Sequence, residues 1–362
     1  MAAKQLASSN LSTPSDTYLY TLARAGSIFA TIGSDDALRL FTSPDLKVSR
    51  TINGANTGLS CLTAGSSSET FLTSGRDARI RVWDPRSSST TANLELAEPK
   101  GAGFSALKCA GNFVAAGTES TKEGLGDVSV LVYDLRAPSA PLRTYAESHT
   151  DTITSLTWHP TQSNLLMSGS TDGLVSIFDA EVAEEEDALM QVLNPRSAVH
   201  CSGFLTDDQV YTLSTDEQFS VYGLEKTGTA EEEPLPMHQF GDLREKLECM
   251  YVVDLIHEPF LPAPVMAYGH NVNQTLSLTS LDPLNWTFGS KIDLPGAHGE
   301  EVVRDVLFVD PQSVLTCGED GCVKLWGFGE QQGAVADAEA VVGKEKKAKR
   351  KAKKEKERFA PY

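Results

Sequence analysis

The chain has 362 residues, of which 7% are aromatic and 22% are charged, a composition typical of a soluble globular protein. Its formal net charge of −18 should repel nucleic-acid phosphates and favour basic partners. No apolar run approaches the ~20 residues of a membrane span, and no apolar segment follows basic residues near the N-terminus, so neither a membrane protein nor a secreted protein is expected.

Residues 1–16 are rich in Ser and Ala, and we expect them to form a flexible N-terminal arm. The stretch from Gln5 to Ser9 is a candidate strand within this arm. Tyr18 to Leu22 then has the pattern of a first inner strand.

A strand–turn–strand pattern recurs along the rest of the chain. Its turn contains an Asp, and an aromatic residue follows six positions later, at Asp35/Phe41, Asp77/Trp83, Asp127/Tyr133, Asp172/Phe178, Asp216/Tyr222 and Asp320/Trp326. The steps between the first five Asp residues are 42, 50, 45 and 44 residues, which is the period of a propeller blade. Between strands, Asp and Gly suit the geometry of a tight turn.

The last step, from Asp216 to Asp320, is 104 residues and leaves room for two blades. A degenerate copy without the Asp or the aromatic fits there, with strands at Val265–Gly269 and Gln274–Leu278. One four-stranded sheet cannot bury both faces, whereas radial stacking of several sheets does. We therefore predict an all-β chain, with a seven-bladed β-propeller over residues 17–328 and a degenerate sixth blade. The repeats resemble those of WD-repeat propellers, and this resemblance implies that the last blade takes its outer strand from the N-terminal arm.

Two blades carry a His shortly before a strand, in His149-Thr150-Asp151 and His298-Gly299-Glu300. With these His residues the repeats resemble WD repeats, in which the His joins a strand Ser or Thr, the turn Asp and a Trp in a buried hydrogen-bond relay. The resemblance implies a structural relay that satisfies buried polar atoms. It would be complete in blade seven but not in blade four, because Phe178 cannot donate a hydrogen bond. Its members would be His149, Ser168, Asp172, His298, Thr316, Asp320 and Trp326.

Longer stretches resemble one family of such proteins, the WD repeat-containing protein 89 family. They are Ala116–Glu119 with the insertion that follows, Asp134–Arg136, His149 through Glu186, and His298 with Val302–Arg304 and Gly318–Asp320. A basic C-terminal tail also fits. The resemblance implies an intracellular scaffold and not a reaction.

No pattern in the sequence indicates catalysis. There is no GxSxG nucleophile motif, no GxxxxGK[ST] phosphate loop and no His, Asp or Glu cluster with metal-ligand spacing. The six cysteines are scattered without a CxxC pair, which favours reduced thiols over zinc ligands or disulfides. We therefore expect no enzyme activity, no cofactor and no metal.

Two motifs predict contacts with partner proteins. Trp83-Asp84-Pro85-Arg86 and Tyr133-Asp134-Leu135-Arg136 end the third strands of consecutive blades. They resemble the box of substrate receptors of cullin-type ubiquitin ligases, in which Arg86 and Arg136 would contact the adaptor. The alternative is a local turn closed by an Asp–Arg ion pair, which contributes little on a surface.

The second candidate surface is the acidic run Glu184, Glu185, Glu186 and Asp187, which lies on loops after blade four. Glu231–Glu233 has a similar place before blade six. Such runs either remain solvated or help to hold a basic partner.

Residues 329–343 have the composition of a flexible linker, and residues 344–362 that of a disordered basic tail. Lys344 to Arg358 holds ten Lys or Arg and three Glu, a net charge of +7. The candidate nuclear-import residues are Lys346, Lys347, Lys349, Arg350, Lys351, Lys353 and Lys354. The alternative is a solvated tail or one that contacts RNA.

These observations predict a non-catalytic scaffold, monomeric on its own and located in the nucleus, the cytoplasm or both. Its partners would be other proteins, with a basic protein such as a ribosomal protein or a histone as the narrower hypothesis. The alternative is a substrate receptor of a cullin-type ubiquitin ligase. Nucleic acid would be contacted only through the tail.

Overall fold

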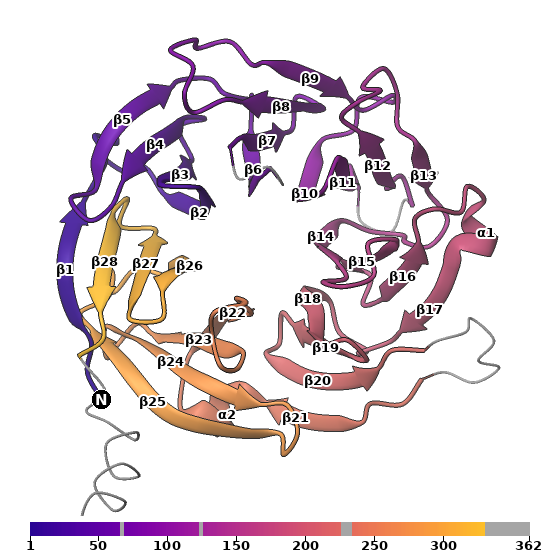
Figure 1. Cartoon of the computed structure of the whole chain (residues 1–362). Helices are drawn as coiled ribbons and strands as arrows, with labels where there is room; N and C mark the ends of the chain where they lie inside the picture. The colour runs from indigo at the N-terminus through magenta and orange to yellow at the C-terminus, as the bar shows by residue number, and fades with distance from the viewer. Residues whose placement is uncertain (66–68, 123–125, 226–233, 330–362) are drawn as a thin grey trace, which may run out of the picture. The chain divides into compact units, whose positions relative to one another are not determined.

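The computed structural model describes residues 1–65, 69–122, 126–225 and 234–329. These residues form seven four-stranded antiparallel sheets arranged as a ring around a central axis (Figure 1). The predicted all-β, seven-bladed propeller is therefore confirmed. The linker from residue 330 onward, the basic tail and Glu231–Glu233 lie outside the described residues.

Each blade runs from an inner strand to an outer strand. Blade one comprises β2 (Leu19–Ala25), β3 (Ile28–Gly33), β4 (Leu38–Thr42) and β5 (Lys47–Ile52). Blade two comprises β6 (Leu59–Ala64), β7 (Phe71–Gly75), β8 (Arg79–Trp83) and β9 (Leu94–Ala97). Blade three comprises β10 (Phe104–Ala110), β11 (Phe113–Thr118), β12 (Val130–Asp134) and β13 (Arg143–Tyr145).

Blade four comprises β14 (Ile153–Trp158), β15 (Leu165–Ser170), β16 (Val175–Asp179) and β17 (Leu189–Leu193). Blade five comprises β18 (Val199–Thr206), β19 (Gln209–Ser214), β20 (Gln218–Gly223) and β21 (His238–Asp242). Blade six comprises β22 (Tyr251–Ile256), β23 (Val265–His270), β24 (Thr275–Asp282) and β25 (Thr287–Pro295). Two short helices lie between strands: α1 (Glu185–Ala188) within blade four and α2 (Leu243–Leu247) between blades five and six.

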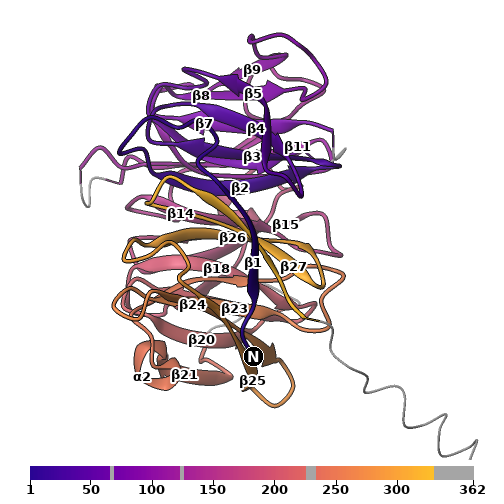
Figure 2. The same ribbon diagram turned by 90° about the vertical axis from the view of Figure 1, so that its left-hand side faces the viewer.

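Blade seven closes the ring with strands from both ends of the chain. Its inner strands are β26 (Val303–Asp310), β27 (Ser313–Gly318) and β28 (Val323–Gly327), and its outer strand is β1 (Lys4–Ser9), which pairs antiparallel with β28. The residues before β1 continue onto blade six, where Ala2 bridges Asp293 of β25 (Figure 2). The N-terminal segment thus contacts blades six and seven, and its strand β1 includes the stretch from Gln5 to Ser9 that the sequence offers as a candidate strand.

Neighbouring blades are joined by hydrogen bonds from β-bulges in their inner strands. Each inner strand has a β-bulge near its first residues, and in four blades the bulged side chain reaches the backbone of the next inner strand. The bonds are Ser60 Oγ to Phe104 O (2.7 Å), Ser105 Oγ to Ile153 O (2.7 Å), Thr154 Oγ1 to Val199 O (2.8 Å) and His200 Nε2 to Val253 O (3.2 Å). A bulge re-aims its side chain, so these hydrogen bonds tie blades two to six together around the axis.

The cores lie between adjacent blades and use the repeated aromatics. Phe178 of blade four stacks on Tyr145 of blade three, with ring centroids 4.6 Å apart, inside one cluster of buried side chains. Blades five and six share a second cluster that contains Phe219 and Phe240. Each blade therefore buries a sheet face against its neighbour, as a stacked repeat requires.

Candidate functional site

In blade seven the relay residues lie together at the end of the blade. Trp326 Nε1 donates to Thr316 Oγ1 (3.1 Å), and the two His298 nitrogens lie 2.7 Å from Thr316 Oγ1 and 2.6 Å from Asp320 Oδ1. Burial lowers the pKa of His298, so a neutral ring can accept from Thr316 and donate to Asp320. Burial raises the pKa of Asp320, but the hydrogen bond from His298, the backbone N–H of Cys322 and the nearby Lys324 ammonium outweigh it and lower the pKa to about 2. All four groups are occupied with one another, so they stabilise the turn and offer nothing to a partner.

Blade four has the shorter version of the relay. His149 lies 2.7 Å from Ser168 Oγ and 3.1 Å from Asp172 Oδ2. Phe178 takes the place of the Trp and packs without a hydrogen bond to Ser168.

Blade two contains a relay member that the sequence analysis missed, because no His precedes that blade. Asn56 Nδ2 donates to Asp77 Oδ1 (3.0 Å), and Asn56 Oδ1 accepts from Thr73 Oγ1 (2.6 Å). Trp83 Nε1 completes the chain by donating to Thr73 Oγ1 (2.8 Å). An amide offers a donor and an acceptor at the same time, as a neutral imidazole does. The available signal was a side chain of this kind about 21 residues before the turn Asp.

The two Asp-x-Arg motifs are closed turns with exposed guanidinium groups. Asp84 accepts from the backbone N–H of Arg86 (2.8 Å) and from its guanidinium (3.0 Å), and Asp134 binds Arg136 in the same way. The pKa of Asp84 and that of Asp134 are lowered by these hydrogen bonds. The side chains of Arg86 and Arg136 nevertheless remain 61% and 63% exposed.

A third Asp-x-Arg unit shows that this geometry is local. Asp242 binds the backbone and guanidinium of Arg244 at the start of α2, which does not follow the third strand of a blade. The closed turn therefore also forms away from the third strands of the blades, and its presence alone does not indicate a partner.

The acidic run lies within blade four, at α1 between β16 and β17, and not on a loop after that blade as the sequence led us to expect. It divides into one internal carboxylate and three exposed ones. Glu185 accepts hydrogen bonds from the N–H groups of Ala146 (2.6 Å) and Ser148 (2.8 Å) and from Ser148 Oγ (2.6 Å). Its two oxygens also accept from the N–H of Glu147, at 3.0 Å each. Glu185 thus joins blade four to the chain that leaves blade three. Glu184, Glu186 and Asp187 are exposed.

Negative charge is concentrated in blades four and five. Residues 144–225 contain 14 Asp or Glu, one Arg and no Lys. Within the described part of the chain, these acids form a single ion pair, between Asp172 and His149. In blades one, two and seven the turn Asp pairs with a cation four residues later: Arg39, Arg81 and Lys324. Blades four and five have Ser176 and Ser220 at that position.

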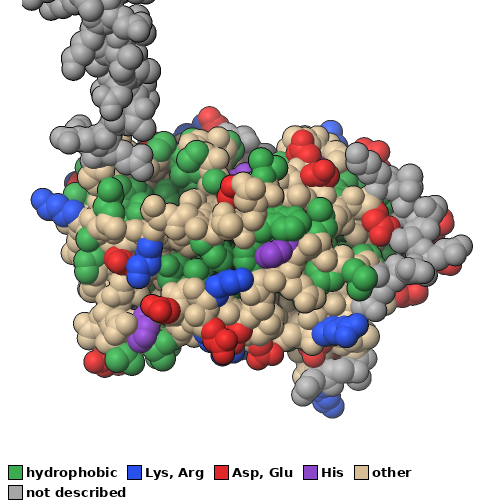
Figure 3. Space-filling model, turned by 90° about the horizontal axis from the view of Figure 1, so that it is seen from below, with side chains coloured by type: hydrophobic (Ala, Val, Ile, Leu, Met, Phe, Trp, Pro, Cys, Tyr) green, Lys and Arg blue, Asp and Glu red, His purple; other side chains and the backbone are tan. Residues whose placement is uncertain are grey.

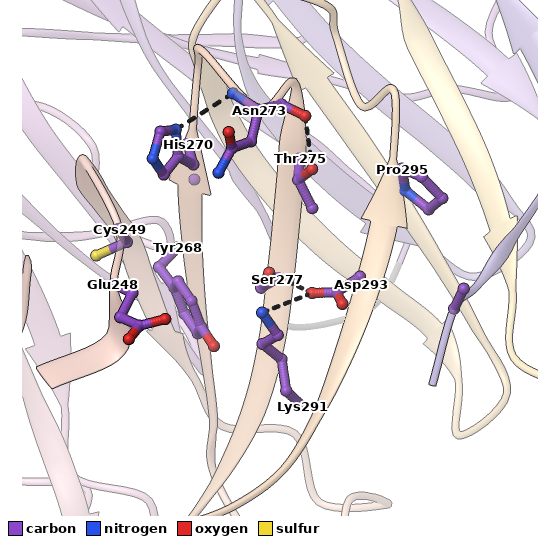
Figure 4. A pocket seen from close by; sticks show the side chains of 12 residues that line it. Glu248, Cys249, Tyr268, His270, Asn273, Thr275, Ser277, Lys291, Asp293 and Pro295 are labelled. Carbon is purple, nitrogen blue, oxygen red and sulfur yellow. Dashed lines mark hydrogen bonds and ion pairs between the residues drawn. The ribbon is translucent and has the colours of Figure 1, made fainter.

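A cavity of about 320 Å³ lies on blade six, beside the end of α2 (Figure 4). Tyr268 lies between Glu248 on one side and the group of Ser277, Asp293 and Lys291 on the other. His270 and Asn273 close one end, and Ala2 of the N-terminal segment also lines the cavity. Figure 3 shows the molecule from below the view of Figure 1, a face on which hydrophobic side chains lie among scattered charges of both signs.

The comparisons with known proteins agree with this geometry. The family model described as WD domain, G-beta repeat matches residues 46–84, 139–179 and 290–327. This chain is a WD-repeat propeller. The matched segments cover the outer part of blade one with most of blade two, the end of blade three with most of blade four, and blade seven with the preceding strand of blade six.

Three proteins from other organisms are similar in sequence to this WD-repeat propeller. An uncharacterized WD repeat-containing protein of Saccharomyces cerevisiae is 38% identical over 249 residues, which are 68% of this chain and 61% of that protein. One of Schizosaccharomyces pombe is 28% identical over 266 residues, 70% of this chain and 78% of the relative. The WD repeat-containing protein 89 homolog of Dictyostelium discoideum is 24% identical over 319 residues, 85% of this chain and 82% of the relative, which confirms the resemblance to that family.

Propellers built from WD40 repeats are in general non-catalytic scaffolds. No group of three or more His, Cys, Asp or Glu among the described residues could hold a metal ion. Burial raises the pKa of Cys201 and, to about 11, that of Cys249, so both remain thiols and are poor nucleophiles. In the same part of the chain, no helix is both long and apolar enough to cross a membrane.

Proposed function

We propose that this propeller is an interaction scaffold that binds a basic protein segment against the exposed carboxylates of blades four and five. The observation that carries the proposal is the ratio of 14 acidic residues to one Arg in residues 144–225. Carboxylates without internal cations produce a local negative potential that attracts Lys-rich and Arg-rich partners. A histone or a ribosomal protein has that chemistry.

Charge reversal tests this proposal. A variant with Glu184, Glu186 and Asp187 changed to Lys should lose most captured Lys/Arg-rich proteins in a pull-down analysed by mass spectrometry, and salt should elute those that wild type captures. The matched control changes Glu300, Glu301 and Asp310 of the blade-seven region to Lys, since these residues are exposed and the net charge changes equally. Equal loss in both variants, or partners that are neutral or acidic, would contradict the proposal.

The ligase-receptor alternative is favoured by one observation. Two consecutive blades present an exposed guanidinium held in the same Asp-x-Arg turn. Changing Arg86 and Arg136 together to Glu should abolish co-purification of the ligase adaptor without lowering the melting temperature, whereas Arg244→Glu should leave it unchanged. Wild type that never co-purifies with the adaptor would exclude this function.

The proposal includes a nuclear location, because the basic residues 346–354 have the composition of a nuclear-import signal. These residues lie outside the described part of the chain. Deleting residues 344–358 from a fluorescent fusion should move the protein out of the nucleus. An unchanged nuclear signal would remove the import hypothesis.

A further inference from the structure

The cavity on blade six is built from strands that lack the repeat pattern. Its walls come from β23, β24 and β25, together with the residues that follow α2. A volume of about 320 Å³ lies at the lower end of the range for ligand sites, which suits a single long side chain better than a large molecule.

One side of the cavity offers an available carboxylate. Glu248 is exposed, and it makes no ion pair with any described residue. Its backbone holds it in place, because it caps α2 in the left-handed conformation (φ 53°) with its N–H bonded to Arg244 O.

The wall beside Glu248 is the ring of Tyr268, whose residue is only 4% exposed. Burial raises the pKa of Tyr268 to about 12, so the phenol stays neutral. An aromatic ring next to a carboxylate is the arrangement that attracts an ammonium or guanidinium group through charge pairing and the cation–π interaction.

On the opposite side of the cavity, the carboxylate of Asp293 is already paired with Lys291. Asp293 Oδ1 lies 2.7 Å from Ser277 Oγ and 3.3 Å from Lys291 Nζ. Lys291 is therefore paired, and the N-terminal ammonium of Met1 donates to Lys291 O (3.0 Å). Glu248 remains the lining carboxylate that makes no ion pair with a described residue.

We propose that this cavity receives a Lys or Arg side chain from an extended segment of a protein partner. The cationic head would lie between Glu248 and the Tyr268 ring, with its aliphatic stem along the wall towards Thr275. The inference rests on the proposed function in so far as the partner is basic, but it concerns a separate surface on blade six.

Short peptides test the site on the full-length protein. Acetyl-Gly-Lys-Gly-amide and acetyl-Gly-Arg-Gly-amide should produce saturable amide shifts in TROSY spectra at residues 248–249, 268–270 and 291–293. The matching norleucine and glutamate peptides should not. Equal binding of the norleucine peptide, or shifts confined to other blades, would overturn the proposal.

Two substitutions in the cavity should change the affinity for the Lys peptide in opposite directions. Glu248→Gln should weaken binding of the Lys peptide by about fivefold, because it removes one charge-assisted contact. Lys291→Gln should strengthen it, because it frees Asp293. Glu245→Gln on α2 is the matched control and should leave affinity unchanged. If Lys291→Gln weakens binding and the glutamate peptide binds best, the cavity is an anion site and the proposal fails.

The blade-four charge-reversal variant separates this inference from the proposed function. Its affinity for the Lys peptide should equal that of wild type. Peptide binding without capture of any basic protein would remove the proposed function and leave the cavity assignment standing. Capture of basic proteins without peptide binding would remove the cavity assignment alone.

Discussion

Blades two and three and blades four and five have the same four-stranded architecture but treat their acidic residues differently. In the first pair the acids meet Arg side chains, as in Asp77–Arg81, Asp84–Arg86 and Arg76–Glu119. In the second pair the turn acids meet no Arg or Lys: Asp172 lies 3.1 Å from His149 Nδ1, and Asp216 accepts from Ser197 Oγ (2.8 Å). The turn acid of blade three, Asp127, likewise accepts from the hydroxyl groups of Ser120 and Thr121. The hairpin needs a partner for its Asp but not a cation. Apart from Asp172, the acids of residues 144–225 pair with no Arg, Lys or His among the described residues.

The largest effect is expected at Glu185, the acid of blade four that is used internally. Glu185→Ala removes the acceptor of several N–H groups and of Ser148 Oγ, and should lower the free energy of unfolding by about 3 kcal/mol. Glu186→Ala should change it by less than about 0.5 kcal/mol, since this side chain is exposed. Urea denaturation of both variants measures the difference. Equal midpoints would mean that Glu185 belongs with the exposed acids.

The next effect concerns the neutral member of the blade-two relay. Asn56→Ala should cost about 2 kcal/mol, because Asn56 is fully buried and its loss leaves the Thr73 hydroxyl without its acceptor. Asn56→His should recover part of this stability, since blades four and seven hold a His in that role. Thermal unfolding of the two variants tests the interpretation, which fails if His is as damaging as Ala.

The pH dependence of stability should show how much the pairing of Asp77 with Asn56 and Arg81 contributes to the free energy of unfolding. Burial raises the pKa of Asp77, but hydrogen bonds from Asn56 and Arg81 outweigh it and hold the pKa below 3.8. A depressed pKa contributes stability above the unfolded value, and this stability is lost as the pH falls through the folded value. Asp77→Asn should therefore be less stable than wild type at pH 6 and should lose less stability between pH 5 and pH 2. Parallel curves for both proteins would contradict this assignment.

The smallest effect should come from giving blade five the cation that blade two has. Ser220→Arg places a guanidinium four residues after Asp216, and should add at most about 1 kcal/mol because such pairs are partly exposed. Ser220→Gln controls for side-chain length. The Arg variant should also bind basic partners slightly less well at low salt. A loss of stability instead would show that the blade-five turn cannot adopt the blade-two arrangement.

The repeated residues made the fold predictable. Each turn Asp and strand aromatic marks a short-range pattern, and the 104-residue gap was enough to place blade six. The contacts that depend on side chains far apart in the chain were not predictable, such as Glu185 with residues 146–148 or Ala2 with Asp293. Asn56 was not predicted, because the relay was expected to contain a His. The hydrogen-bond relay needs only a side chain that donates and accepts at the same time, as Asn56 does. The blade-six cavity had no sequence signal, because its strands share no motif with the other blades.

The pairing of β1 with β28 also has a consequence for biosynthesis. Among the described strands, β1 is the first to be synthesised, and its hydrogen-bonding partner β28 is the last. The ring therefore cannot close before β28 has been synthesised, and until then β1 lacks its partner strand. The entropy of closing so long a loop grows only slowly with length, but contacts of high sequence separation slow folding. A nascent chain halted before β28 should expose β1 to chaperones.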